Sequence, residues 1–299
     1  MLLQAAAVSG VQARLIDWRG PGWAWPDAVL LHTPWDYTAH LREFAAWLRA
    51  QSARTPMVNP LAVTEGNLHK SYLLDLAAAG IPVPVSRLLR AGDGVDESDL
   101  RSTFGGGPVV AKPAVGAGGR RMSRLPDVAG VRSSDLVSAS GVVLEDLLLQ
   151  EFLPAVQTTG QHALVVTAGQ VSHLVHKVAA AGEFRVQPSH GGTKQLVDPD
   201  NATAELERTV LPLVGHLAYA RVDYIVDPLR GPLVMELELT EPDLFLRHHP
   251  PAASRLVEHV LTKWATNRSA IPTSPRRPQP RQRRPTTPNG GSSRRAGTR

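Results

Sequence analysis

The chain has 299 residues and carries 32 Lys and Arg against 27 Asp and Glu, a formal net charge of +5. This length can bury a sizeable core and predicts more than one structural unit. Because there is no cysteine, disulfides, thiolate metal sites and cysteine nucleophiles are excluded. No apolar run reaches membrane-spanning length, and the first residues lack the pattern of a signal peptide, so we expect a cytoplasmic protein with no membrane partner.

The charge is unevenly distributed along the chain. Residues 268–299 contain nine arginines and no acidic residue, so the rest of the chain is acidic overall. This segment is rich in Pro, Ser, Thr and Gly, and it has too few apolar residues to offset the entropy of ordering it. We therefore predict a disordered tail over 267–299. Without interleaved aromatic residues, we do not expect nucleic acid as its partner.

The first 63 residues have the pattern of a small α/β domain. Strands are predicted at 11–18 and 28–32, and apolar spacing predicts a helix over 41–50. Residues 33–37 follow a strand directly, which is where open α/β sheets collect ligands. This segment could contact a substrate, but for Trp35 we favour a packing role between sheet and helix.

The following segment predicts a helix with a lysine near its start. The helix would begin near Thr64 or Asn67, both suitable N-cap residues, and end before Gly80. Lys70 would lie in the first turn, where the helix dipole disfavours a positive charge. A bound anion would explain it, and an exposed lysine without a function is the alternative.

A glycine-rich loop follows an apolar strand that ends at Lys112. Gly116, Gly118 and Gly119 would let backbone N–H groups approach a phosphate closely. The loop is not a Walker loop, because the lysine precedes the glycines, and Arg121 stands where a dinucleotide-binding loop has its last glycine. A mobile surface loop is the alternative.

Two further strands carry candidate binding residues. An apolar strand ends in Gln150 and Glu151, and such a strand edge can hold an adenine ring through its backbone; a plain core strand is the alternative. Residues 160–177 predict a hairpin that ends at Lys177, and the next loop contains Arg185. These two bases could clamp a phosphate or be ordinary surface charges.

The most informative segment is an acidic hairpin whose two apolar strands flank the turn Asp-Pro-Leu-Arg-Gly-Pro. Side chains alternate along a strand, so Glu236 and Glu238 share a face. If Val226 pairs with Leu233, Asp223 falls opposite the first of these two. Three crowded carboxylates on an apolar hairpin call for a cation, and oxygen ligands suit Mg²⁺. The alternative is an edge hairpin with a solvated acidic face.

The order of these motifs resembles the ATP-grasp superfamily, most of all its glutathione-synthetase-like branch. The likeness covers residues 64–264. Within that branch, residues 172–242 and the Trp-Asp-Tyr segment at 35–37 look like the cyclo-ligases of D-cycloserine biosynthesis, which close the ring of O-ureido-D-serine.

The resemblance implies an α/β (α+β) fold, with an N-terminal pre-ATP-grasp domain over 1–63 and two ATP-grasp subdomains over 64–266, of which 85–148 form a lid. It also implies individual roles. The residues that would bind the ATP phosphates are Lys70, Lys112, Gly116, Gly118 and Gly119, and those that would hold adenine are Gln150, Glu151 and Leu153. Gln161 would contact the ribose, at a position where an acid is usual, and the catalytic residues would be Lys177 and Arg185. The metal would be bound by Asp223, Glu236 and Glu238.

Together these roles imply a ligase that uses ATP and Mg²⁺, with Mn²⁺ as a substitute. It would phosphorylate the carboxylate of a small amino-acid-like substrate and let an internal nitrogen attack. An intermolecular carboxylate–amine ligase and a nucleotide-binding protein without catalysis are the alternatives. The three metal carboxylates favour an enzyme, because a nucleotide binder does not need them. The sequence leaves open whether the chain forms a homo-oligomer.

Overall fold

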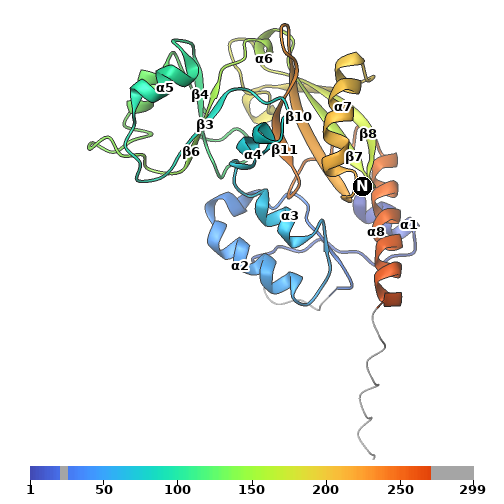
Figure 1. Cartoon of the computed structure of the whole chain (residues 1–299). Helices are drawn as coiled ribbons and strands as arrows, with labels where there is room; N and C mark the ends of the chain where they lie inside the picture. The colour runs from blue at the N-terminus through green and yellow to red at the C-terminus, as the bar shows by residue number, and fades with distance from the viewer. Residues whose placement is uncertain (21–25, 271–299) are drawn as a thin grey trace, which may run out of the picture.

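The computed structural model describes residues 1–20 and 26–270, which form three β-sheets surrounded by helices (Figure 1). None of the helices in these two ranges has the length and apolar character needed to cross a membrane. The predicted tail lies outside the described residues from residue 271 onward. Its first four residues, 267–270, belong to helix α8 (Pro251–Ala270), so the prediction of disorder is wrong for them.

The central sheet has five antiparallel strands in the order β11-β10-β7-β8-β9. They are β7 (Gln161–Thr167), β8 (Gln170–Val178), β9 (Thr193–Val197), β10 (Tyr219–Asp227) and β11 (Gly231–Glu238). Both predicted hairpins are confirmed, because β7 pairs with β8 and β10 pairs with β11. The acidic hairpin therefore forms one edge of this sheet.

The pairing of β10 with β11 differs by one residue from the prediction near the turn. Ile225, and not Val226, pairs with Leu233. A β-bulge next to Asp223 takes up one extra residue of β11, so that Asp223 still pairs with Glu236. The predicted facing of the two carboxylates is confirmed, although the pairing assumed near the turn was wrong.

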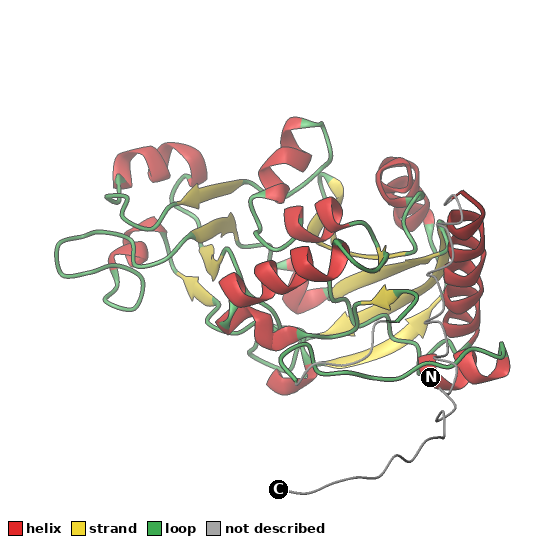
Figure 2. Cartoon of the chain, turned by 90° about the horizontal axis from the view of Figure 1, so that it is seen from below, coloured by secondary structure: helices red, strands yellow, loops and turns green. Residues whose placement is uncertain are grey.

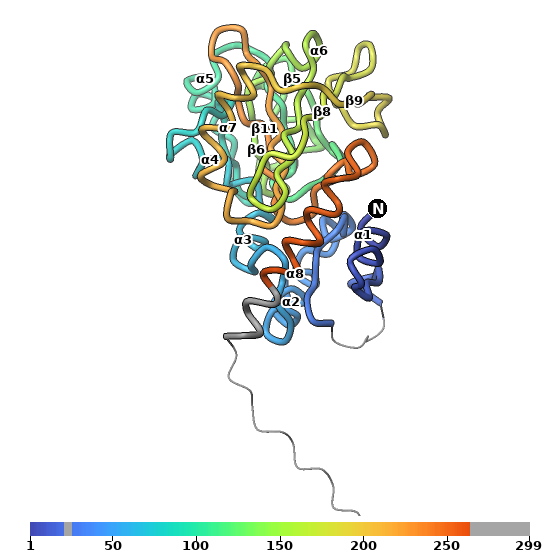
Figure 3. The backbone as a smooth tube through the Cα atoms, turned by 90° about the vertical axis from the view of Figure 1, so that its right-hand side faces the viewer, coloured from blue at the N-terminus to red at the C-terminus, as the bar shows by residue number. Residues whose placement is uncertain are grey.

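Helices cover both faces of the central sheet (Figure 2). On one face, α7 (Asn201–Val214) buries Leu206, Val210 and Val214, which share one side of the helix because they are four residues apart. On the other face, α8 buries Ala252 and Leu256, and α1 (Leu2–Val8) packs beside it (Figure 3). The sheet is thus buried on both sides.

A second, four-stranded antiparallel sheet forms a separate lobe, to the left in Figure 1. Its order is β3-β6-β4-β5, with β3 (Ser86–Leu89), β4 (Val109–Pro113), β5 (Ser123–Leu125) and β6 (Leu147–Glu151). The 3-10 helix η2 (Val128–Arg132) and α5 (Glu97–Phe104) close its core, in which Leu100, Val109, Val131 and Leu149 are buried.

The N-terminal segment contains a two-stranded parallel sheet of β1 (Val29–Leu30) and β2 (Met57–Val58), the 3-10 helix η1 (Trp35–Ala39) and α2 (Leu41–Ser52). The predicted strand at 28–32 and helix at 41–50 are confirmed. The strand predicted at 11–18 is wrong, because residues 11–17 have no regular structure. Leu15 is 74% exposed there, so its side chain has no core to pack against.

The single helix predicted around Lys70 is two short helices, α3 (Leu61–Gly66) and α4 (Tyr72–Ala78). Tertiary hydrogen bonds hold the break between them. The Asn67 side chain donates to the Leu237 carbonyl and accepts from the Leu239 N–H, both at 2.7 Å. The Lys70 N–H donates to the Ala114 carbonyl at 2.7 Å. Lys70 therefore lies in this break, before α4 and not in its first turn.

Asn59 joins the N-terminal segment to the central sheet. Its Nδ2 donates to the carbonyls of Tyr219 and Leu239, both at 2.9 Å, and its Oδ1 accepts from the Ala218 N–H at 3.0 Å. The residue is buried, and its backbone is left-handed with φ +62°, which asparagine tolerates better than most residues. One side chain therefore satisfies three buried backbone groups.

We expect Asn59→Ala to lower the free energy of unfolding by roughly 2–4 kcal/mol, because it leaves these groups unpaired and strains the backbone. Urea unfolding of the full chain measures the change. Asn59→Gly relieves the backbone strain but not the lost hydrogen bonds, so its loss should be smaller. Equal stability of Asn59→Ala and the unmodified chain would contradict the role of this residue.

Candidate active site

Three carboxylates meet on the hairpin at the edge of the central sheet. Asp223 stands on β10, and Glu236 and Glu238 stand on β11; one oxygen of each lies within 4.8 Å of the others. Asp223 is buried, and the two glutamates are partly buried. In the part of the chain that the structure describes, this is the one group of three acids or histidines close enough to share a metal ion.

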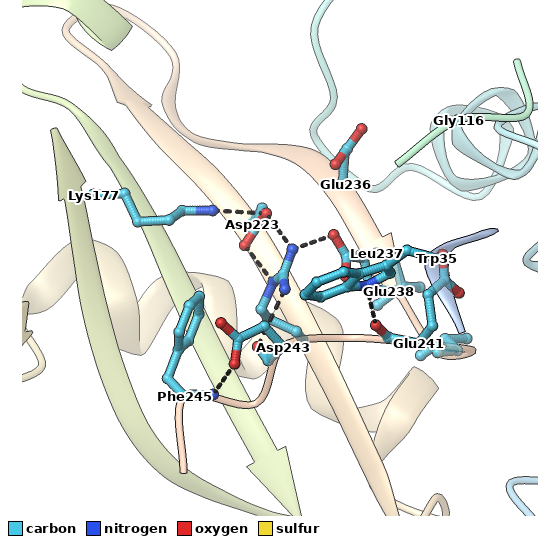
Figure 4. A network of polar contacts seen from close by, with 12 residues as sticks. Trp35, Gly116, Lys177, Asp223, Glu236, Leu237, Glu238, Glu241, Asp243 and Phe245 are labelled. Atoms are coloured by element: carbon cyan, nitrogen blue, oxygen red, sulfur yellow. Dashed lines mark hydrogen bonds and ion pairs between the residues drawn. The ribbon is translucent and has the colours of Figure 1, made fainter. Parts of the chain in front are cut away.

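Two basic side chains neutralise one side of this cluster (Figure 4). Lys177 Nζ lies 2.8 Å from Asp223 Oδ2. Arg221 donates to both oxygens of Asp223, at 3.0 and 3.1 Å, and also to Glu238. Arg221 is two residues from Asp223 on β10, so both side chains lie on the same face of the sheet.

Two lysines from other parts of the fold neutralise the other side. Lys70 Nζ lies 3.5 Å and Lys112 Nζ 3.7 Å from the same oxygen of Glu236. Lys70 also donates to the carbonyl of Gly116 at 2.7 Å, and Lys112 donates to Oε1 of Gln150 at 3.2 Å. The site is therefore assembled from the central sheet, the break before α4 and the four-stranded lobe.

The two glutamates of β11 differ in acidity. Burial opposes the ionisation of both carboxyls. At Glu236 the positive charges of Lys70 and Lys112 have the larger effect, and they lower the pKa of that carboxyl to about 2. At Glu238, burial and the neighbouring carboxylates prevail over Arg221 and raise the pKa to about 8. A divalent cation at the cluster would favour the ionised form of Glu238.

The cluster fits a magnesium ion by the chemistry of its donors. All three side chains offer carboxylate oxygens, which Mg²⁺ prefers, and the oxygens are close enough to bind one ion. The ion would share Asp223 and Glu238 with Arg221, since that guanidinium contacts both. Asp223, Glu236 and Glu238 are thus the residues that would hold the metal.

The glycine-rich loop after β4 lies against both the cluster and the N-terminal segment. Gly118 and Gly119 have φ of +65° and +69°, a conformation that favours glycine. A Cβ on Gly119 would lie 2.8 Å from Oε1 of Gln187, so the Gln187 side chain would have to shift to make room for it. Arg120 donates to the Thr38 hydroxyl at 2.8 Å and ties the loop to η1.

The loop, the two glutamates of the cluster and η1 line a cavity of about 380 Å³, and Lys70 and Lys112 line it too. A smaller cavity of about 60 Å³ adjoins it, because the two share Lys112 and Glu236. The smaller cavity is lined by the residues predicted to contact adenine and ribose, and by one of the two predicted catalytic residues: Gln150, Glu151, Leu153, Gln161 and Arg185.

Arg185 and Lys177, both predicted to be catalytic, line different cavities and have different partners. Lys177 contacts Asp223 and lines the larger cavity. Arg185 pairs with Glu183 at 2.6 Å and lines the smaller one. Glu151 is engaged by Arg230, also at 2.6 Å. The roles given to these residues stay predictions.

Two residues of the site differ from what the sequence indicated. Trp35 is not wedged between sheet and helix: it is 47% exposed and lines the larger cavity, so the packing role was wrong. Arg221 was given no role, although its spacing from Asp223 already placed it on the acidic face. Its guanidinium donates to Asp223 and to Glu238 and so links two of the three carboxylates.

The chain matches two family models. Residues 67–244 match the RimK-like ATP-grasp domain, and residues 1–59 match the N-terminal domain of D-cycloserine synthetase DcsG. The first match covers more than half of the chain, so the chain belongs to the RimK-like ATP-grasp family. It is an ATP-dependent ligase with an ATP-grasp fold, as the order of its motifs indicated.

Individual relatives agree with this family. The chain is 28% identical to the cycloserine biosynthesis protein DcsG of Streptomyces lavendulae over 86% of its own length and 90% of that protein. The crystal structure of D-cycloserine synthetase DcsG matches with a TM-score of 0.73 and 26% identity, over 88% of this chain and 93% of that chain. A D-alanine–D-alanine ligase from Bacillus anthracis, complexed with ATP, shares the fold at 17% identity, with a TM-score of 0.59 over 82% of this chain and 81% of that chain.

We expect Glu236→Gln to abolish Mg²⁺-dependent ATP turnover and to lower stability at neutral pH, because Lys70 and Lys112 lose the carboxylate between them. The pKa of Glu236 lies below its ordinary value of 4.5. Its charge therefore stabilises the fold above about pH 5, and this contribution is lost as the pH falls toward 2.

Urea unfolding at several pH values measures this contribution. The free energy of unfolding of the unmodified chain should exceed that of the variant by about 1–3 kcal/mol near pH 7, and the difference should shrink as the pH falls from about 5 toward 2. Full ADP release by Glu236→Gln would refute the metal assignment.

Lys112→Ala should weaken ATP binding by ~1.5–3 kcal/mol, the effect of losing one charged hydrogen bond. Calorimetry with a non-hydrolysable ATP analogue measures it. Lys263→Ala, which removes an exposed lysine of α8, serves as the control and should bind the analogue normally. Unchanged affinity in Lys112→Ala would show that this lysine does not contact the phosphates.

Proposed function

We propose that this ligase closes the ring of O-ureido-D-serine to form D-cycloserine. One observation carries the proposal: the likeness to D-cycloserine synthetase extends over both parts of the chain. Residues 1–59 match the N-terminal domain of that enzyme, and the likeness to the cycloserine biosynthesis protein DcsG of Streptomyces lavendulae covers 86% of the chain. An ATP-grasp match alone would leave the substrate open, because the N-terminal segment supplies part of the cavity wall through Trp35 and Tyr37.

The cavity supports a small substrate placed against the acidic cluster. Its volume of about 380 Å³ lies in the range of small-molecule sites. Lys70 and Lys112 line it beside the glycine-rich loop, which suits the phosphates of ATP. Lys177 and Arg221 line it too, and they would neutralise a substrate carboxylate.

In the first step, an oxygen of the substrate carboxylate attacks the γ-phosphorus of ATP. The bond from that phosphorus to the bridging oxygen breaks, ADP leaves, and the substrate carries an acyl phosphate. Mg²⁺ held by Asp223, Glu236 and Glu238 would neutralise charge on the transferred phosphoryl group. Lys112 and Lys70 hold the phosphates, and Arg221 and Lys177 hold the carboxylate in place.

In the second step, the ureido nitrogen bonded to oxygen attacks the acyl carbon of the same molecule. It loses its proton, phosphate leaves, and a five-membered ring closes. Water then cleaves the bond between ring nitrogen and carbamoyl carbon, which yields carbon dioxide and ammonia. Because nucleophile and electrophile belong to the same molecule, no second substrate must be captured. This lowers the free-energy barrier of ring closure by roughly several kcal/mol relative to a reaction between two molecules.

The second candidate is a ligase that joins two molecules. It is favoured by a 30% identity over 143 residues to a probable α-L-glutamate ligase of Shewanella halifaxensis, which covers 48% of this chain and 30% of that protein. In that reaction the amine comes from another molecule. The two candidates therefore differ in whether a second amine is needed.

The test is to incubate the full chain with ATP, Mg²⁺ and O-ureido-D-serine and to analyse the products by mass spectrometry. We expect ADP, phosphate, ammonia and D-cycloserine in equal amounts with no added amine. D-Serine, which lacks the ureido nitrogen, should give no ring. A product that forms only with a second amine, and that contains both molecules, would contradict ring closure and support the second candidate.

A further inference from the structure

The larger cavity has one wall that the proposed chemistry does not use. Trp35 and Tyr37 of η1 contribute to it, together with Glu241 and Asp243 from the segment after β11. Figure 4 shows Trp35 and Glu241 next to each other, joined by the hydrogen bond from the indole to the backbone carbonyl. This wall combines an aromatic surface with acidic side chains.

Glu241 differs from the other acids that line the cavity. It is only 7% exposed, and its carboxyl shares a hydrogen bond with the Tyr37 hydroxyl. Among the residues that the structure describes, no basic nitrogen lies within 4 Å of it. The other lining acids each have one: Glu236 has Lys70 at 3.5 Å, Glu238 has Arg221, and Asp243 has Lys194 at 3.1 Å.

A buried carboxylate without a cationic partner is costly, and burial raises the pKa of the Glu241 carboxyl. The side chain nevertheless lines the cavity that faces the acidic cluster. A ligand with a positive charge would supply the missing partner. A ligand carboxylate at this position would instead be repelled.

Trp35 adds a second feature that suits a cation. Its Nε1 donates to the backbone carbonyl of Glu241 at 3.1 Å, which fixes the indole beside that residue. Trp35 is 47% exposed and lines the cavity, and the face of an indole attracts cations. The backbone carbonyl of Trp35 accepts a hydrogen bond from Arg120, so the glycine-rich loop is tied to the same place.

We propose that Glu241 and Trp35 form the subsite for the α-ammonium group of the amino-acid substrate. The inference deepens the proposed function and rests on it for the identity of the ligand. In an α-amino acid the ammonium and the carboxylate stand on one carbon. Binding the ammonium at Glu241 directs the carboxylate toward Arg221, whose positive charge also acts on Glu241.

Binding measurements with and without the amino group test this subsite. The probes are O-ureido-D-serine and its desamino analogue, 3-(ureidooxy)propanoate, titrated by calorimetry into the full chain with Mg²⁺ and a non-hydrolysable ATP analogue. We expect the unmodified chain to prefer the amino compound by about 10- to 100-fold, the effect of one charged hydrogen bond. In Glu241→Gln this preference should fall to about threefold or less.

The matched control is Glu43→Gln, which removes an exposed carboxylate of α2 and should keep the full preference. If Glu241→Gln does not fold, Trp35→Leu provides the second measurement. It removes the aromatic face, leaves the acid, and should reduce the preference by about 3- to 10-fold.

The preference should survive in the control and be lost in the subsite variants. An unmodified chain with no preference, or a Glu241→Gln protein with an undiminished one, would overturn the inference. Binding requires no turnover, so the two proposals fail separately. A retained preference without ring closure would overturn the proposed function alone.

Discussion

The structure depends on the compensation of buried negative charge by lysine and arginine side chains. Like charges packed this closely on a sheet repel one another, and burial increases the cost of each. The hairpin tolerates its three carboxylates because four basic groups lie among them. Each comes from a different place: Lys70 from the break before α4, Lys112 from the four-stranded lobe, Lys177 from β8, and Arg221 from β10 itself.

This arrangement links the fold to the chemistry of the family. Positive charge lies beside each carboxylate of the cluster. Transfer of a phosphoryl group to a substrate carboxylate needs such positive charge, because both reacting groups are negatively charged. The bases also join the parts of the fold, because the lobe and the central sheet meet at the contact between Lys112 and Glu236. A substitution in the cluster therefore affects stability as well as activity.

Much of the site was predictable because strands have a simple periodicity. Alternation placed Glu236 and Glu238 on one face, and a bulge next to Asp223 preserved their partner although the assumed pairing near the turn was wrong. The same alternation would have found Arg221. The sequence alone does not show that this arginine contacts two carboxylates at once.

The remaining errors arose where long-range contacts override local pattern. The helix around Lys70 is broken where Asn67 forms hydrogen bonds with Leu237 of β11, 170 residues further along the chain, and with Leu239 just after that strand. Trp35 was expected to pack between the sheet and the helix of the N-terminal segment. A hydrogen bond to the carbonyl of Glu241, 206 residues distant, instead holds its ring at the cavity.

The most direct test of the charge-compensated metal site is Mn²⁺ binding, followed by electron paramagnetic resonance in the presence of a non-hydrolysable ATP analogue. The full chain should bind Mn²⁺, and Glu238→Gln should bind it at least about tenfold more weakly, because one of three carboxylate ligands is lost. Glu43→Gln, changed at a distant exposed carboxylate, should bind as the unmodified chain does. Equal affinity of Glu238→Gln and the unmodified chain would show that the hairpin carboxylates do not hold the metal.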